Sequence, residues 1–228
     1  MNIALILAAG SGSRIHSEVP KQFIKIKDKP LFMYPTLIFN NNPNIDKIII
    51  VTSEPHIEEV KKEILKYNTN KVIAVVKGGK TRKESTYFGL LKLKELNIND
   101  NDIVLIHDAA RAMINDQIIN QNILACEKYS AVCTAIPAAD TIVMSSNGKY
   151  ITNLLNRDEL YINQTPQTFK FDLIFKAHQN ALNKDEIYTD DANLVFQLNH
   201  RIHFVEGSKN NFKITTDFDL EVFKNLIK

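Results

Sequence analysis

Five short apolar runs recur along the first part of this 228-residue chain, and helix-like stretches separate them. The runs lie at 2–9, 48–52, 72–76, 103–107 and 131–136, and the helix-like stretches at 30–41, 55–65, 81–96 and 115–129. Strands that are apolar at every position, rather than at alternate positions, are typical of parallel sheets covered by helices on both faces. With right-handed crossovers, this order predicts an α/β fold with a doubly wound, mostly parallel, Rossmann-like sheet.

The pattern changes after the fifth run, where a helix would be expected. Two short strand-like segments, 141–144 and 149–152, flank the sequence Ser-Ser-Asn-Gly. Asn-Gly between two such segments is a strong hairpin signal. We therefore expect a β-arm at about 138–160 that projects from a single domain spanning 1–228. The remaining chain predicts helices at 172–182, 189–198 and 217–227, with a strand at 201–205.

Composition excludes several classes of protein. The chain has 28 Lys and Arg against 26 Asp and Glu, so its net charge of +2 gives no broad basic surface for nucleic acid or membrane lipid. No apolar run reaches the length of about 18 residues that a membrane span needs. The amino-terminal run lacks a basic segment before it, so it predicts a strand and not a signal peptide. Cys126 and Cys133 form no C-x-x-C pair, and we expect a reduced, cytoplasmic protein.

A glycine-rich turn ends the first strand. The chain has only seven glycines, and this turn holds Gly10 and Gly12. Backbone N–H groups in such a turn can cradle phosphate oxygens. A dinucleotide fingerprint would need a third glycine where Ile15 stands, and the Lys of a Walker loop is absent. Two interpretations remain, a triphosphate loop with Arg14 and Lys21 as its cations, or a plain turn beside solvated basic residues.

A second glycine pair follows the third strand, in the segment Gly-Gly-Lys-Thr-Arg-Lys-Glu-Ser at 78–85. Ligands of open α/β sheets bind at the carboxyl ends of the strands, so this segment lies on the ligand side. Its backbone and the Ser85 hydroxyl are suited to reading the edge of a base. The structural alternative is a helix start capped by Thr81, with Glu84 completing a capping box.

The fourth strand ends in His-Asp-Ala-Ala-Arg, residues 107–111. Asp108 is placed to bind a ribose hydroxyl or a magnesium ion, and Arg111 to bind a phosphate. The structural alternative is a salt-bridged strand end. We assign His107 to packing and hydrogen bonding, because no serine or cysteine nucleophile accompanies it.

Other polar residues are less specific on their own. Thr189 is typical of a helix cap and Lys213 of a solvated lysine, so each has a structural alternative. Thr141, Arg157 and Thr165 open, close and follow the expected arm. No cluster of cysteine and histidine predicts a zinc site, and no G-x-S-x-G elbow predicts a serine hydrolase.

Taken in order, these motifs resemble one family along essentially the whole chain. The matching segments are AAGSGSR, PKQ, GGKTRKES, IHDAAR, DTI, NRDELYINQTPQTF, YTDDA and VEGSKNNFKITT. They resemble the cytidylyltransferases that include 2-C-methyl-D-erythritol 4-phosphate (MEP) cytidylyltransferases. The resemblance implies an enzyme that joins CTP and MEP, with Mg²⁺ as cofactor, giving 4-diphosphocytidyl-2-C-methyl-D-erythritol and pyrophosphate. A non-catalytic nucleotide-binding protein on the same fold is the remote alternative.

The resemblance also implies roles for individual residues. Arg14 and Lys21 would stabilise the transition state, and Arg157 and Lys213 would position the acceptor phosphate. Asp108 would bind the acceptor or the ribose near the metal. The remaining predicted residues form three groups. Gly10 and Gly12 would form the loop that binds CTP, and the cytosine would be read by Ala8, Ala9, Gly79, Lys80 and Ser85. Further substrate contacts would come from Arg111, Thr141, Thr165 and Thr189. In this family the arm crosses to a second subunit, which implies a homodimer.

The acceptor has one close alternative, because related enzymes use ribitol 5-phosphate. The HDAAR and TDDA segments look more like the methylerythritol enzymes. The QTPQTF segment and Val143 lean toward the ribitol enzymes. The sequence therefore predicts MEP as the acceptor, with ribitol 5-phosphate as the alternative.

Overall fold

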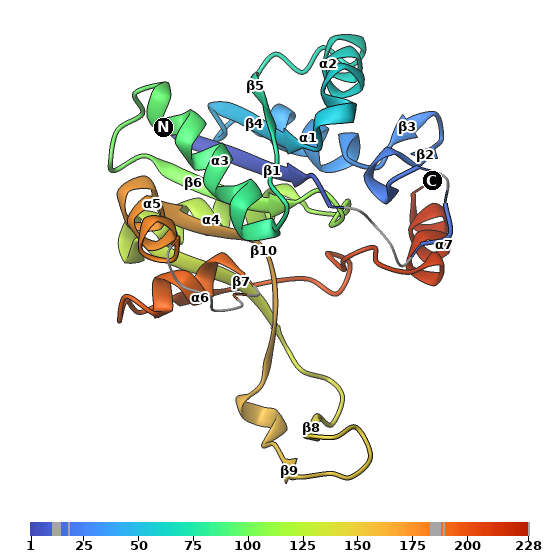
Figure 1. Cartoon of the computed structure of the whole chain (residues 1–228), viewed down its shortest axis with the longest axis vertical. Helices are drawn as coiled ribbons and strands as arrows, with labels where there is room; N and C mark the ends of the chain where they lie inside the picture. The colour runs from blue at the N-terminus through green and yellow to red at the C-terminus, as the bar shows by residue number, and fades with distance from the viewer. Residues whose placement is uncertain (11–14, 18, 183–187, 189, 228) are drawn as a thin grey trace.

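A seven-stranded sheet forms the centre of the molecule in the computed structural model (Figure 1). The structure describes all residues except 11–14, 18, 183–187, 189 and 228. Across the sheet the strand order is β11-β7-β10-β6-β1-β4-β5. The strands are β1 (Asn2–Ala8), β4 (Lys47–Thr52), β5 (Val72–Lys77), β6 (Ile103–Asp108), β7 (Ala131–Pro137), β10 (Tyr161–Lys170) and β11 (His203–Glu206).

Helices cover both faces of this sheet, which explains the unbroken apolar strands. One face packs against α1 (Met33–Asn41), α2 (Ile57–Lys66) and α4 (Asp116–Tyr129). The other packs against α3 (Arg82–Glu95), α5 (Phe171–Asn180) and α6 (Asp191–Phe196). Successive strand residues point to opposite faces, so Ile48 and Ile50 enter one core while Ile49 and Val51 enter the other. Each such side chain contributes about 1.5–3 kcal/mol on burial. The predicted fold class is confirmed.

A third, smaller apolar cluster lies beside the main sheet. Here Leu220 and Phe223 of α7 (Asp217–Leu226) join Ile26 of β2 (Lys25–Ile26) and Leu31, which follows β3 (Lys29–Pro30). This cluster brings the carboxyl-terminal segment next to the chain that follows β1. No helix within the described ranges is long and apolar enough to cross a membrane.

The strand β10 was not predicted. It runs antiparallel between β6 and β7, in the middle of the sheet. Its polar side chains are buried with partners, for example Thr168, whose hydroxyl donates to Asn122 Oδ1 at 3.0 Å. Pro166 lies where the pairing with β7 shifts register, between Asn163 and Gln167. Central strands rarely contain a proline or a run of polar residues, so the sequence pattern did not indicate a central strand here.

The projecting arm is confirmed, and Figure 1 shows it extending away from the sheet. Its hairpin pairs β8 (Val143–Met144) with β9 (Asn153–Leu154), and the turn η3 (Arg157–Glu159) follows. The expected second strand at 149–152 was wrong. Asn147 Oδ1 instead accepts hydrogen bonds from the backbone N–H groups of Lys149 and Tyr150, so these residues fold into the loop at the tip.

Both cysteines are buried and free, as expected. Burial raises the pKa of the Cys126 thiol and of the Cys133 thiol to about 12. Because the thiolate is the nucleophile, we expect neither to react with a disulfide reagent at pH 8 while the chain is folded. Titration should release both thiols only after denaturation. Rapid labelling of the native protein would contradict this burial.

Candidate active site

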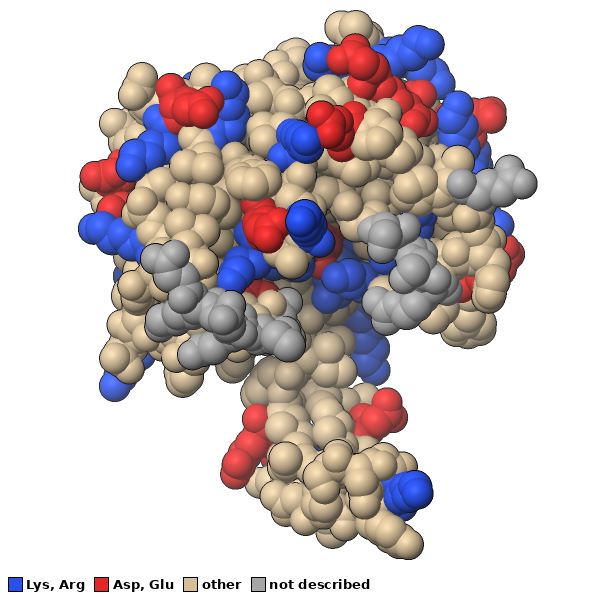
Figure 2. Space-filling model, in the orientation of Figure 1, with Lys and Arg blue, Asp and Glu red and all other residues tan. Residues whose placement is uncertain are grey.

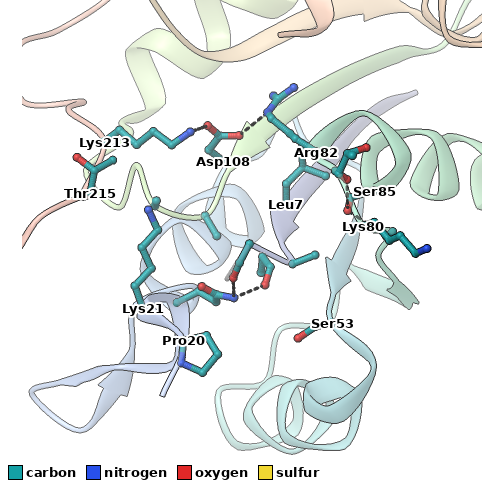
Figure 3. Close-up of a pocket in the computed structure, with 18 residues that line it drawn as sticks. Leu7, Pro20, Lys21, Ser53, Lys80, Arg82, Ser85, Asp108, Lys213 and Thr215 are labelled. Atoms are coloured by element: carbon teal, nitrogen blue, oxygen red, sulfur yellow. Dashed lines mark hydrogen bonds and ion pairs between the residues drawn. The ribbon is translucent and has the colours of Figure 1, made fainter. Parts of the chain in front are cut away.

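A cavity of about 540 Å³ opens at the carboxyl ends of β1, β4 and β6, where the sequence placed the ligand side (Figure 3). Basic side chains gather around the middle of the face drawn in Figure 2, above the arm. The cavity is lined by Leu7, Ala8, Ala9, Gly10, Pro20, Lys21, Gln22, Ser53, Gly79, Lys80, Thr81, Arg82, Ser85, Asp108, Ala109, Ala110, Lys213 and Thr215.

The first wall of the cavity is the exit of β1 and the short turn η1 (Lys21–Phe23). Gln22 joins them, because its amide nitrogen donates to the carbonyl oxygens of Ala8 at 2.8 Å and Gly10 at 2.7 Å. Lys21 Nζ donates to the carbonyl oxygen of Ile214 at 2.8 Å. The structure thus brings the predicted residues Ala8, Ala9, Gly10 and Lys21 together; Gly12 and Arg14 lie outside the described residues.

The second wall is the start of α3. Thr81 caps this helix by accepting a hydrogen bond from the Glu84 N–H at 3.1 Å. The Glu84 carboxylate accepts from the Lys80 N–H, one residue before the cap. The Ser85 hydroxyl accepts from the Gly79 N–H at 3.1 Å and donates to the Thr81 carbonyl at 2.9 Å. Helix capping and cavity lining therefore occur in the same segment.

The two walls approach closely at Gly78. A Cβ atom added at this position would lie 2.5 Å from the Ala9 Cβ and 3.0 Å from the Ser85 Oγ. Any larger residue would push the walls apart. The exit of β1 and the start of α3 therefore pack directly against the backbone of Gly78.

The third wall carries the charge. Asp108 lies between two cations, with Arg82 Nε 3.1 Å from its Oδ1 and Lys213 Nζ 2.7 Å from its Oδ2. Burial alone would raise the pKa of this carboxyl, but Arg82 and Lys213 outweigh that effect and hold the pKa well below its usual range. Arg82 Nη1 also binds Asp191 Oδ2 at 2.6 Å, tying the cavity to the start of α6. Lys213 is therefore paired, not simply solvated.

Two predicted contact residues, Arg111 and Thr165, are not part of the cavity lining but form hydrogen bonds with segments around it. Arg111 donates to the carbonyl oxygens of Asn211 at 2.8 Å and Asn163 at 3.1 Å. The Thr165 hydroxyl accepts from the Asp108 N–H at 3.1 Å and contacts His107 Nδ1 at 3.1 Å. The packing role of His107 is confirmed: burial lowers its pKa to about 4, so its ring is neutral at physiological pH.

The remaining predicted residues lie elsewhere. Thr141 and Arg157 are exposed on the arm, away from the cavity of their own chain (Figure 1). Thr189 lies outside the described residues, and the cap of α6 is its neighbour Asp190, which accepts from the Asn193 N–H at 2.9 Å.

Several cavity residues were missed from the sequence. They are Leu7, Pro20, Gln22, Ser53, Thr81, Arg82, Ala109, Ala110 and Thr215. Arg82 could have been found, because it stands in the second glycine segment, on the same side of the sheet as Asp108. Ser53 carries no motif signal beyond its place at the end of β4.

The described lining has one carboxylate, Asp108, against Lys21, Lys80, Arg82 and Lys213. No group of three or more acidic, histidine or cysteine side chains within the described ranges could hold a metal by itself. Such a site suits a polyanion, whose charge four cations can balance. To complete its coordination beside Asp108, a divalent ion would need further ligands, such as the phosphate oxygens of a bound polyanion.

Comparison with known proteins agrees with this geometry. The family model described as 2-C-methyl-D-erythritol 4-phosphate cytidylyltransferase matches residues 2–228. A protein of that name from Clostridium novyi is 40% identical over 228 residues, covering 100% of this chain and 96% of the relative. A ribitol-5-phosphate cytidylyltransferase from Vibrio parahaemolyticus is 36% identical over 229 residues, with coverage of 100% and 96%.

A solved structure extends the match to three dimensions. The 4-diphosphocytidyl-2C-methyl-D-erythritol synthase from Anaerococcus prevotii superposes with a TM-score of 0.83 at 29% identity, covering 98% of this chain and 96% of that one. The family model spans nearly all of the sequence, and residues of the segments AAGSGSR, PKQ, GGKTRKES, IHDAAR and VEGSKNNFKITT line the cavity. This chain belongs to the 2-C-methyl-D-erythritol 4-phosphate cytidylyltransferase family of nucleotidyltransferases.

Proposed function

We propose that this chain transfers the cytidylyl group of CTP to the phosphate of MEP and releases pyrophosphate. The observation that carries the proposal is the convergence of four cations and one carboxylate on a cavity at the carboxyl ends of the central strands, in a member of this family. Both substrates are polyanions, so a local excess of positive charge offsets their repulsion although the whole chain has a net charge of only +2.

The reaction is an in-line displacement. An oxygen of the acceptor phosphate forms a bond to the α-phosphorus of CTP, while the bond from that phosphorus to the oxygen bridging it to the β-phosphate breaks. The leaving pyrophosphate takes the electron pair of the broken bond. The attacking phosphate is already anionic, so no strong general base is required, and catalysis depends on positioning and on positive charge near the transferred group.

Individual residues divide this work. Lys21 and Arg14 stabilise the charge that develops on the α-phosphate in the transition state. Lys213 and Arg157 position the acceptor phosphate. The segments containing Ala8, Ala9, Gly79, Lys80 and Ser85, which line the cavity, read the polar edge of the cytosine ring.

Asp108 is the residue suited to hold a magnesium ion. Its depressed pKa keeps it ionised at neutral pH, and Mg²⁺ in nucleotide sites usually takes one or two carboxylates together with phosphate oxygens and water. A bound Mg²⁺ would neutralise charge on the triphosphate and polarise the α-phosphate. One of the Asp108 oxygens would then exchange its present cationic partner for the ion or for a ribose hydroxyl.

The arm completes the site of a neighbouring subunit in this proposal. Thr141 and Arg157 are exposed on the arm, and Met144, Tyr150, Ile151 and Leu154 are exposed apolar side chains there. A closed homodimer would bury these side chains and bring each Arg157 to its partner's cavity.

Mixing two inactive variants tests this arrangement. Lys21→Ala and Arg157→Ala should each be nearly inactive alone, but a heterodimer keeps one complete site. After subunit exchange at equal concentrations, about a quarter of wild-type turnover should return, since half the dimers are mixed and each has one intact site. If the mixture stays inactive although mixed dimers form, the arm does not serve the neighbouring site.

Ribitol 5-phosphate is the second candidate acceptor, and the full-length match to a ribitol-5-phosphate cytidylyltransferase favours it specifically.

Product identification by mass spectrometry tests the proposed reaction. Incubation with CTP, MEP and Mg²⁺ should give a cytidine diphosphate ester and equimolar pyrophosphate. CTP consumption without such an ester would contradict the proposal.

A further inference from the structure

Gln22 occupies a position that the proposed chemistry has not yet used. Its side chain is 3% exposed and bridges two segments of the first wall. One nitrogen, Nε2, donates to the carbonyl oxygens of Ala8 at 2.8 Å and Gly10 at 2.7 Å. The NH₂ group supplies two donors from a single atom, whereas a carboxylate or a thioether supplies none.

The same residue lies inside the turn that carries Lys21. The Gln22 carbonyl oxygen accepts from the Phe32 N–H at 3.0 Å, and the Phe23 ring stacks on His56 with 4.2 Å between ring centroids. His56 Nδ1 lies 2.9 Å from the hydroxyl of Ser53, a lining residue on β4's exit. The turn is therefore fixed to the core on one side and, through Gln22, to the exit of β1 on the other.

We infer that Gln22 is a positioning residue for nucleotidyl transfer. It holds the Ala8–Gly10 backbone and the Lys21 ammonium in the relative positions that let both contact one bound triphosphate. The inference rests on the proposed function and adds to it. Lys21 Nζ is held from the opposite side by the Ile214 carbonyl. Releasing the Gln22 amide would let the turn and the β1 exit move independently, and a misplacement of about 1 Å can cost about 100-fold in rate.

Gln22→Met tests the inference, because it keeps the length of the side chain and removes both donors. We expect kcat to fall about 100-fold and the Kd for CTP to rise about tenfold. Asn42→Leu is the matched control. Its buried amide also donates twice, to Asp116 Oδ1 at 2.7 Å and Asn120 Oδ1 at 3.1 Å, and it lies outside the cavity lining.

Thermal unfolding of both variants separates positioning from stability. Gln22→Ala replaces the methionine variant if that variant does not fold. The inference is overturned if the Gln22 variant loses thermal stability like Asn42→Leu while its kcat and its Kd for CTP stay within about threefold of wild type.

A double-variant cycle tests the link to Lys21. In the Lys21→Ala background, Gln22→Met should lower kcat by clearly less than about 100-fold, because one of the two groups that Gln22 aligns is already gone. A further full 100-fold loss would overturn the link. If the wild type binds CTP but turns over neither acceptor, the proposed function fails, and the CTP Kd still tests Gln22. If the wild type does not bind CTP, both fail.

Discussion

Lys21→Ala is expected to lower kcat by about 1,000-fold while the protein stays folded. The Lys21 side chain lines the cavity from a turn that Gln22 and Phe23 anchor independently, so its removal leaves the turn in place. In the proposed mechanism, what disappears is the positive charge that stabilises the α-phosphate in the transition state. A charge felt mainly in the transition state affects kcat more than substrate binding.

Steady-state pyrophosphate release at saturating CTP and acceptor gives kcat, and thermal unfolding reports the fold. Lys25→Ala is the control, since Lys25 lies four residues further along, is exposed and is not part of the cavity lining. Near-normal turnover by Lys21→Ala would contradict the assignment of the site. A large loss in both variants would indicate a general effect of positive charge.

Asp108→Asn is expected to lower kcat/KM by about 100-fold or more. The carboxylate binds Arg82 and Lys213 simultaneously, and its pKa lies well below the usual range because of them. The neutral amide cannot balance the charge of the two cations, and its oxygen would bind a divalent ion more weakly than the carboxylate. Arg82 would then keep Asp191 as its remaining anionic partner, while Lys213 would lose the contact that orients it.

Asp102→Asn is the matched control for this variant. Asp102 is also buried and also pairs with a cation, the amino terminus, but it precedes the opposite end of the same strand, β6. Kinetics and thermal unfolding of both variants should give a loss of stability in each and a loss of kcat/KM in Asp108→Asn alone. Equal kinetic losses would contradict a direct role for Asp108.

The sequence predicted most of the central sheet because each parallel strand had to be apolar on both sides. Ile48 to Val51 illustrate this, since alternate residues of one run enter two separate cores. The strand β10 was not predicted, because its buried side chains include polar groups that form hydrogen bonds instead of an apolar run. Gln167 Oε1 accepts from the backbone of Asp191 and Ala192, a pairing that no local pattern reveals.

The sequence predicted those lining residues that belong to motifs at the carboxyl ends of strands. Ala8, Gly79, Asp108 and their neighbours share one edge of the sheet because parallel strands present their carboxyl ends together. Lys213 was predicted as a site residue and lines the cavity, but its ion pair with Asp108 joins residues 105 positions apart and was not predicted. Arg82 likewise pairs with Asp108 and Asp191, which lie 26 and 109 positions away. Gln22 bonds residues only 14 and 12 positions away, but no local pattern reveals that pairing.

The most direct test of the central claim is an initial-rate comparison of two acceptors. Mg²⁺-dependent pyrophosphate release from CTP would be measured with MEP and, side by side, with D-ribitol 5-phosphate. We expect kcat/KM for MEP to exceed that for ribitol 5-phosphate by about 100-fold or more. A preference for ribitol 5-phosphate would contradict the proposed acceptor, and release with neither would contradict the proposed reaction itself.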